Sequence, residues 1–331
     1  MNIIGIDVSK SKLDCVLICS SRPDKELEKR VTNSEQGISK LIDWCTRKAN
    51  CDPSQIHAIM EATGPYHEPV ALALFKGGCK VSVVNPAQIK HYGQGLGRKA
   101  KNDKQDASVI ARYGFKEKPR LWQPDPEEYR HLRALLYRLD AVESDIQREK
   151  NRLEKAQAAQ SPPVISQSIE RSIEFLEEEK ARLEKQIKEH IDNHPHLKKD
   201  KELLESIPGI GPVLSSWMSL LLRNGQRFDA APQAAAFVGL TPTEHKSGST
   251  VFKKPQLSKV GPSIYRAKLY MPAIVAIKHN PDVKDLYQRL LAKGKTKMAA
   301  LGAAMRKLVH ICFGVIKNQS PYQPQIAPLG G

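Results

Sequence analysis

The sequence of 331 residues predicts two structural classes in one chain, an α/β region over residues 1–118 followed by mainly helical regions. In the first region, short apolar segments with the two-residue period of strands alternate with longer segments of helical spacing. Beyond residue 126, apolar residues recur at steps of three and four, and glycine and proline mark the junctions. The length suffices for about two domains.

Three strand signals open the α/β region. In "NIIGIDV", Ile4, Ile6 and Val8 share one face and Asp7 lies on the other. The segment "LDCVLIC" is predicted to pair with it as a hairpin, and a more polar strand is expected at "LEKRVT". A helix in "SEQGISKLIDWCTRKA", a strand in "IHAIME", a helix in "EPVALALFKGG", a strand in "KVSVV" and a last helix opening near residue 103 come next. This order fits a mixed sheet flanked by helices, as in the ribonuclease H-like fold.

Residues 126–193 carry the spacing of two long helices. The apolar positions are Leu132, Leu135, Leu139, Val142, Ile146 and Leu153 in the first helix, and Ile169, Ile173, Leu176, Leu183 and Ile187 in the second. They predict a coiled-coil hairpin or a dimer arm, although helices packed on their own domain explain the spacing equally well. Residues 198–320 are predicted as a mainly helical domain and residues 321–331 as a disordered tail.

The charge balance points to a polyanion as partner. Lysine and arginine number 52 against 36 aspartates and glutamates, a formal net charge of +16, which favours nucleic acid over a membrane surface. We find no basic leader and no apolar run long enough to span a bilayer, so we expect a cytoplasmic protein without a membrane partner. Six cysteines without C-x-x-C spacing are expected to be reduced thiols rather than zinc ligands or disulfides.

Four acidic residues are candidates for a metal site. Asp7 interrupts an apolar strand, Glu61 ends another strand, and Asp103 and Asp106 are spaced to share one face of a helix. Aspartates in a first helical turn are also favoured without any function, but a carboxylate inside an apolar strand is costly unless it is paired. If the first and fourth strands are neighbours, a helix across the sheet edge can bring all four acids together, where Mg²⁺ would offset their repulsion.

Two further segments predict contacts with nucleic acid. In "IPGIG", Gly209 and Gly211 would let backbone N–H groups approach a phosphate, as in a helix-hairpin-helix unit; a plain helix junction is the alternative. In "TEHKSGSTVFKK", a Ser-Gly-Ser loop between helices could offer a hydroxyl nucleophile, or be a solvated basic loop. The candidates there are Ser247, Ser249 and Thr250 as nucleophiles and Lys246, Lys253 and Lys254 as phosphate contacts.

Together these motifs resemble one family over nearly the whole chain. The matching segments include "IGIDVSKSKLD", "MEATGPYHEPVALAL", "KNDKQDA", "LLESIPGIGPVLSS", "AAFVGLTPTEHKSGST" and "LSKVGPSIYRAKLYMPA", which contains Arg266 as a further predicted nucleic-acid contact. The sequence resembles the DEDD-type transposases of insertion sequences, the IS110 group, which join a RuvC-like domain to a C-terminal transposase domain.

The resemblance implies a function and a site. Asp7, Glu61, Asp103 and Asp106 would bind Mg²⁺, and Ser247 would attack a DNA phosphate to give a phosphoserine intermediate. It also implies a site shared between protomers of a dimer or tetramer, and a non-coding bridge RNA that pairs with donor and target DNA. We therefore expect a DNA transposase. The alternatives are a RuvC-like nuclease that cuts branched DNA without a covalent step and a non-catalytic architectural protein. An actin-like ATPase is set aside, since the chain lacks a second Asp-Gly phosphate loop.

Overall fold

The computed structural model describes residues 1–96, 103–247 and 251–325, without the side chains of 103–104, 244–247 and 251–255. The chain divides into two compact units, Met1–Asp125 and Pro126–Gly331. The first unit extends past the predicted boundary at residue 118. The amide of Trp122 donates to the carbonyl of Val81, and the Trp122 ring meets the ring of Phe75 edge to face, which ties this segment to the sheet unit.

A five-stranded mixed sheet forms the centre of the first unit. Its strands are β1 (Asn2–Val8), β2 (Lys12–Cys19), β3 (Arg22–Thr32), β4 (Ile56–Glu61) and β5 (Lys80–Val84), in the spatial order β3-β2-β1-β4-β5. The first three strands pair antiparallel, whereas β4 runs parallel to both β1 and β5. The predicted α/β class is therefore confirmed, and β1 and β4 are neighbours, which is the condition that we set for bringing the predicted acids together.

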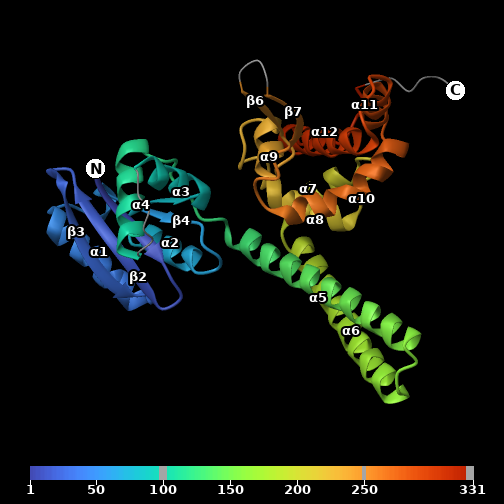
Figure 1. Cartoon of the computed structure of the whole chain (residues 1–331), viewed down its shortest axis with the longest axis horizontal. Helices are drawn as coiled ribbons and strands as arrows, with labels where there is room; N and C mark the ends of the chain where they lie inside the picture. Colours follow the sequence, from blue (N-terminus) through green and yellow to red (C-terminus); the bar gives the residue numbers. More distant parts are fainter. Residues whose placement is uncertain (97–102, 248–250, 326–331) are drawn as a thin grey trace. The chain divides into compact units, whose positions relative to one another are not determined.

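Helices cover both faces of this sheet. On one face, α1 (Glu35–Ala49) and α2 (His67–Lys76) bury residues such as Leu41 and Leu74 against the even-numbered residues of β1. On the other face lie α3 (Pro86–Gly95) and α4 (Asp103–Glu117), with α4 drawn teal in Figure 1. The helix α4 approaches β1 so closely that a side chain at Gly5 would collide with the backbone of Ala107 and Ala111. It thus covers a face, not the sheet edge that we expected.

A buried histidine ties β4 to β5 on the α4 face. His57 is 4% exposed, and its Nε2 lies 2.7 Å from Ser82 Oγ. The Ser82 hydroxyl donates its proton to the carbonyl of Arg120 at 2.8 Å, so His57 Nε2 is the donor to Ser82. Burial, with Lys80 nearby, lowers the pKa of His57 from 6.5 to about 4.

This histidine predicts a loss of stability in acid. Because the pKa of His57 is lower in the folded chain, the neutral ring stabilises the fold above about pH 6.5, and that contribution falls as the pH drops toward 4. The shift corresponds to at most about 3 kcal/mol. We expect the free energy of unfolding, measured in urea between pH 7.5 and 4, to fall less for His57→Gln than for the unchanged chain. Equal pH profiles would contradict the prediction.

The second unit begins with two long helices, α5 (Glu127–Ala158) and α6 (Pro163–Asp192), which run antiparallel in Figure 1. The buried positions of α5 include Leu132, Leu136 and Leu139; the predicted Leu135 is only partly buried. These leucines belong to the same core as the following helices, which joins the predicted coiled-coil segment and C-terminal domain in one unit. Lys268, from α10 (Ser263–His279), contacts Asp140 on α5 at 2.8 Å.

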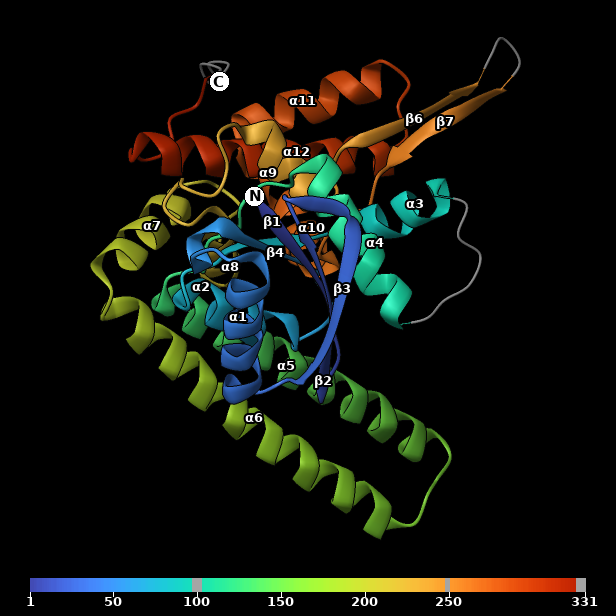
Figure 2. The ribbon, with the colours of Figure 1, turned by 90° about the vertical axis from the view of Figure 1, so that its left-hand side faces the viewer.

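The rest of the unit is mainly helical, with one β-hairpin. Its other helices are α7 (Pro195–Glu205), α8 (Pro212–Leu222), α9 (Ala231–Phe237), α11 (Pro281–Ala292) and α12 (Lys297–Asn318). Between α9 and α10, the chain forms the antiparallel strands β6 (Pro242–Ser247) and β7 (Val251–Leu257), a long ribbon in Figure 2. We predicted a loop here and missed the strands, because "PTEHKS" and "VFKKPQL" lack the two-residue alternation of apolar and polar residues that marks a strand.

Two expectations for the C-terminal region need correction. Residues 321–325 are anchored rather than disordered: the Tyr322 hydroxyl donates to Asp282 Oδ2 at 2.8 Å, and the amide of Gln325 donates to Asp282 Oδ1 at 3.1 Å. Asp282 is itself buried. Within the described residues, one helix, α12, is long and apolar enough to cross a membrane, although we found no such run in the sequence; 61% of its apolar window is buried inside the unit.

Candidate functional site

The first part of the predicted acidic site is a pair of neighbouring strand positions. The β1–β4 register aligns Ile4 with Ala58 and Ile6 with Met60, so the next residues in the parallel pair are Asp7 and Glu61. Both point to the α4 face, since they lie two residues beyond Gly5 and Ile59, which face that helix. Both are partly exposed. The sheet thus gives Asp7 and Glu61 adjacent strand positions on one face, and their role as metal ligands stays a prediction.

The direction of α4 brings its first turn toward Asp7 and Glu61. Gly114, late in α4, packs on Ile3 and Ile59, whereas Ala107 and Ala111 pack on Gly5. The two elements therefore run in opposite directions, so the first turn of α4 lies near the end of β1 that carries Asp7. Asp103 is the first residue of this helix and Asp106 lies one turn later, partly exposed. The fold thus brings together β1, β4 and the first turn of α4, the elements that carry the four predicted acids.

The metal site itself is not preformed among the described side chains, which include no group of three or more His, Cys, Asp or Glu residues placed to hold an ion. The side chain of Asp103 lies outside that set. The predicted ligands with described side chains, Asp7, Glu61 and Asp106, are all carboxylates, and oxygen donors suit a hard cation such as Mg²⁺ better than zinc. The six cysteines are free thiols, and five of them are buried.

One acid beside this site escaped the sequence analysis. Asp14 on β2 pairs directly with Asp7 on β1, so both side chains lie on the α4 face, and Asp14 is only 5% exposed. Its carboxylate contacts Arg30 Nε at 2.6 Å and Lys12 Nζ at 3.3 Å. The hairpin prediction already aligned β1 with β2, so the Asp7–Asp14 pair could have been found from the turn length.

The candidate nucleophile lies in the second unit. Ser247 is the last residue of β6 and pairs with Val251 at the start of β7. Ser249 and Thr250 lie outside the described residues. Lys246, Lys253 and Lys254 belong to the same β-ribbon. The ribbon therefore carries the predicted serine together with the three predicted phosphate contacts.

The two glycines of the "IPGIG" turn have different environments. Gly209 has a positive φ of 102°, and a side chain there would come within 2.9 Å of the Ala276 backbone on α10. Packing alone thus accounts for glycine at 209. Gly211 precedes α8 as its N-cap, with nothing within 4 Å of its Cβ position. Open space at the positive end of a helix fits the predicted phosphate contact for Gly211.

This difference predicts separate effects of two alanine substitutions. Gly209→Ala is expected to cost roughly 2–4 kcal/mol, because the left-handed backbone and the Ala276 contact both oppose a Cβ. Gly211→Ala is the matched control and should change the free energy of unfolding by less than about 0.5 kcal/mol. Urea unfolding of both variants checks this; equal losses of stability would refute the distinction.

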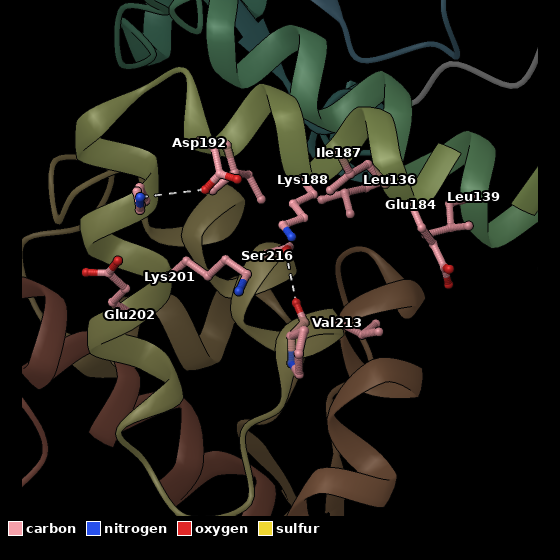
Figure 3. Close-up of a pocket in the computed structure, with 13 residues that line it drawn as sticks. Leu136, Leu139, Glu184, Ile187, Lys188, Asp192, Lys201, Glu202, Val213 and Ser216 are labelled. Atoms are coloured by element: carbon pink, nitrogen blue, oxygen red, sulfur yellow. Dashed lines mark hydrogen bonds and ion pairs between the residues drawn. The ribbon is translucent and has the colours of Figure 1, made fainter. Parts of the chain in front are cut away.

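A hollow of about 400 Å³ lies beside this turn, between α5, α6, α7 and α8. Figure 3 shows Leu136, Ile187 and Val213 among its walls, with lysines and acids around them. The lysines are Lys188, Lys198 and Lys201, and the acids are Glu184, Asp192 and Glu202. Equal numbers of opposite charges leave no net attraction for a phosphate, so the hollow does not extend the predicted contact at Gly211.

Arg266, the last predicted nucleic-acid contact, has a partner within the fold. Its Nη1 donates to the carbonyl of Val238 at 2.9 Å, and it is partly exposed. This bond joins α10 to the end of α9, just before the β-ribbon. The hydrogen bond gives Arg266 a structural role, and its contact with nucleic acid stays a prediction.

Comparisons with known proteins agree along the chain. The family described as "Transposase" (DEDD type, IS110) matches residues 4–158, and the "Transposase IS116/IS110/IS902 family" matches residues 201–288. A pilin gene-inverting protein of Moraxella bovis is 33% identical over 98% of this chain and 98% of its own length. The transposase for insertion sequence element IS1111A of Coxiella burnetii is 23% identical over 98% of this chain and 92% of its own length.

Proposed function

Because the chain belongs to the IS110 family of transposases, we propose that it cuts and rejoins DNA with a divalent metal held by four acids and a serine nucleophile. The observation that carries the proposal is the β1–β4 pairing, which sets Asp7 beside Glu61 under the helix that begins at Asp103. An acid inside an apolar strand is costly unless it has a cation to bind, and a metal site explains it.

The metal site would be formed by Asp7, Glu61, Asp103 and Asp106. Bound there, Mg²⁺ would polarise a phosphate and offset the charge that develops on its oxygens. The acids themselves would hold the ion at the open edge of the α4 face, where the partial exposure of Asp7, Glu61 and Asp106 leaves access for DNA. Carboxylates brought close together repel one another, which favours the occupied site.

The covalent step would use Ser247. Its Oγ attacks the phosphorus of the scissile phosphodiester, a P–Oγ bond forms, and the bond from phosphorus to the departing deoxyribose oxygen breaks. The serine gives up its proton and the departing oxygen gains one, so no oxidant or other co-reactant is needed. Attack of a second strand's hydroxyl on the phosphoserine reverses these changes and joins new partners. Such an exchange conserves phosphodiester bonds.

The acids and the serine belong to different compact units, Met1–Asp125 and Pro126–Gly331. A site completed between protomers of a dimer or tetramer fits this division, as in the family. The net charge of +16 fits a nucleic-acid partner, and a bridge RNA that pairs with both DNA sites would supply the sequence specificity. The same chemistry would serve inversion of a gene, and the Moraxella relative is named a pilin gene-inverting protein.

The test is incubation of the protein with labelled element-junction DNA, its candidate RNA and Mg²⁺, followed by a denaturing gel. A slow band that protease converts to free DNA is the expected result, since it contains DNA linked to protein. Nicked DNA without such a band would favour the RuvC-like nuclease, in which water is the nucleophile. Binding that ignores Mg²⁺ and yields no cleavage would favour the architectural protein.

A further inference from the structure

A row of charged residues crosses four strands on the α4 face. The registers pair Arg30 with Asp14 and Asp14 with Asp7, and Glu61 comes after Asp7 in the β1–β4 pairing. Directly opposed residues on neighbouring strands point to the same face, with Cβ atoms roughly 5 Å apart. We call this row the acid row; it consists of one cation followed by three acids, namely Arg30, Asp14, Asp7 and Glu61. Two of these acids are predicted metal ligands, and Asp14 is not.

Asp14 is the most buried member of the acid row. It is 5% exposed, next to Val16, which packs on Ala107 in α4. Both of its oxygens face cations: Oδ1 contacts Arg30 Nε at 2.6 Å, and Oδ2 contacts Lys12 Nζ at 3.3 Å. A carboxylate with both oxygens committed in this way is poorly placed to bind a metal directly. It is well placed to hold two cations beside Asp7.

The arrangement is not explained by stability. Asp7 and Asp14 are like charges directly opposite each other, which destabilises a strand pair. The ion pairs of Asp14 also contribute little to stability, because the partner side chains are 58% exposed in Arg30 and 37% exposed in Lys12. The next two residues of β2 on this face, Val16 and Ile18, are apolar. The position of Asp14 therefore calls for a role that depends on charge.

We propose that Asp14 is a positioning residue for the metal site: it holds Lys12 and Arg30 at the end of the acid row and so sets the affinity of the acids for a divalent cation. The inference rests on the proposed function. Without Asp14, less negative charge would offset Lys12 and Arg30 beside Asp7, so the two cations would oppose a metal ion more strongly. Without Arg30, the acid row would gain net negative charge and attract the ion more strongly.

The opposite signs of these two effects provide the test. Mn²⁺ binding to the full chain is measured by electron paramagnetic resonance, counting only the binding that Asp7→Asn removes. Asp14→Asn is expected to raise the Mn²⁺ dissociation constant, and Arg30→Gln to lower it, each by roughly three- to tenfold for one charge at this separation. The double variant, Asp14→Asn with Arg30→Gln, should bind Mn²⁺ with nearly the affinity of the unchanged chain. Thermal unfolding confirms that each variant is folded.

Glu26→Gln is the matched control. Glu26 is a partly buried carboxylate on β3 whose Oε1 accepts a hydrogen bond from Arg112 Nε at 2.6 Å, outside the acid row. Its substitution should leave Mn²⁺ affinity unchanged. Weaker Mn²⁺ binding in both single variants, or no change in either, would overturn the role of Asp14. Identical Mn²⁺ binding by the unchanged chain and Asp7→Asn would instead overturn the proposed metal site, a separate failure.

Discussion

Replacing Ser247 by alanine is expected to abolish the covalent protein–DNA product, a loss of at least about a thousandfold, because alanine has no hydroxyl to attack phosphorus. Binding of labelled junction DNA should stay within about twofold, since one hydroxyl at the end of a basic ribbon contributes little to affinity that arises from charge. The measurements are the protease-sensitive band on a denaturing gel and a filter-binding titration, both made with RNA and Mg²⁺.

The neighbouring hydroxyls provide the matched controls. Ser249→Ala and Thr250→Ala each remove one hydroxyl within three residues of Ser247 in the sequence and should keep the covalent product within about threefold of the unchanged yield. A covalent product that persists in Ser247→Ala but disappears in one control would move the nucleophile to that residue. Equal nicking by Ser247→Ala and the unchanged chain, without any covalent band, would identify a nuclease that uses water.

The positions of the strands along the chain of the first unit were predictable, because their residues carry strong local signals. Ile4, Ile6 and Val8 alternate with residues of the other face, and Asn85-Pro86 marks the end of β5. The same two residues begin a separate helix that we did not predict, α3, in which Asn85 is the N-cap and accepts a hydrogen bond from the amide of Ala87. A proline that ends a strand can equally begin a helix.

The acid row shows where the sequence alone is insufficient. Asp7 was found because a charge inside an apolar strand is conspicuous, whereas Asp14 stands beside Cys15 in a strand that reads as apolar and hairpin-paired. Its importance depends on the register that aligns it with Asp7 and Arg30, and on burial under α4. Register is a relation between strands, so no single segment contains it. The β-ribbon that carries Ser247 was missed for a different reason, since its two strands lack alternating apolar residues.

Asp7→Asn is expected to remove strand cleavage, with at least about a thousandfold loss of rate, while the chain stays folded. Asparagine keeps the size of the side chain but loses the charge that a Mg²⁺ ion needs at the centre of the acid row. Asp106→Asn should act in the same way, because the direction of α4 carries this residue toward Asp7. Cleavage of labelled junction DNA, measured over time at saturating Mg²⁺, gives the rates.

The control for these substitutions is Asp43→Asn, which removes an exposed acid of α1, a helix on the opposite face of the sheet. Its cleavage rate should match that of the unchanged chain.

If the metal site is shared between protomers, mixing the Asp7→Asn protein with the Ser247→Ala protein should restore part of the activity. Mixed oligomers then contain one site with both intact acids and an intact serine. Full activity of Asp7→Asn alone would refute the metal site, and failure of the mixture to recover would place acids and serine in the same protomer.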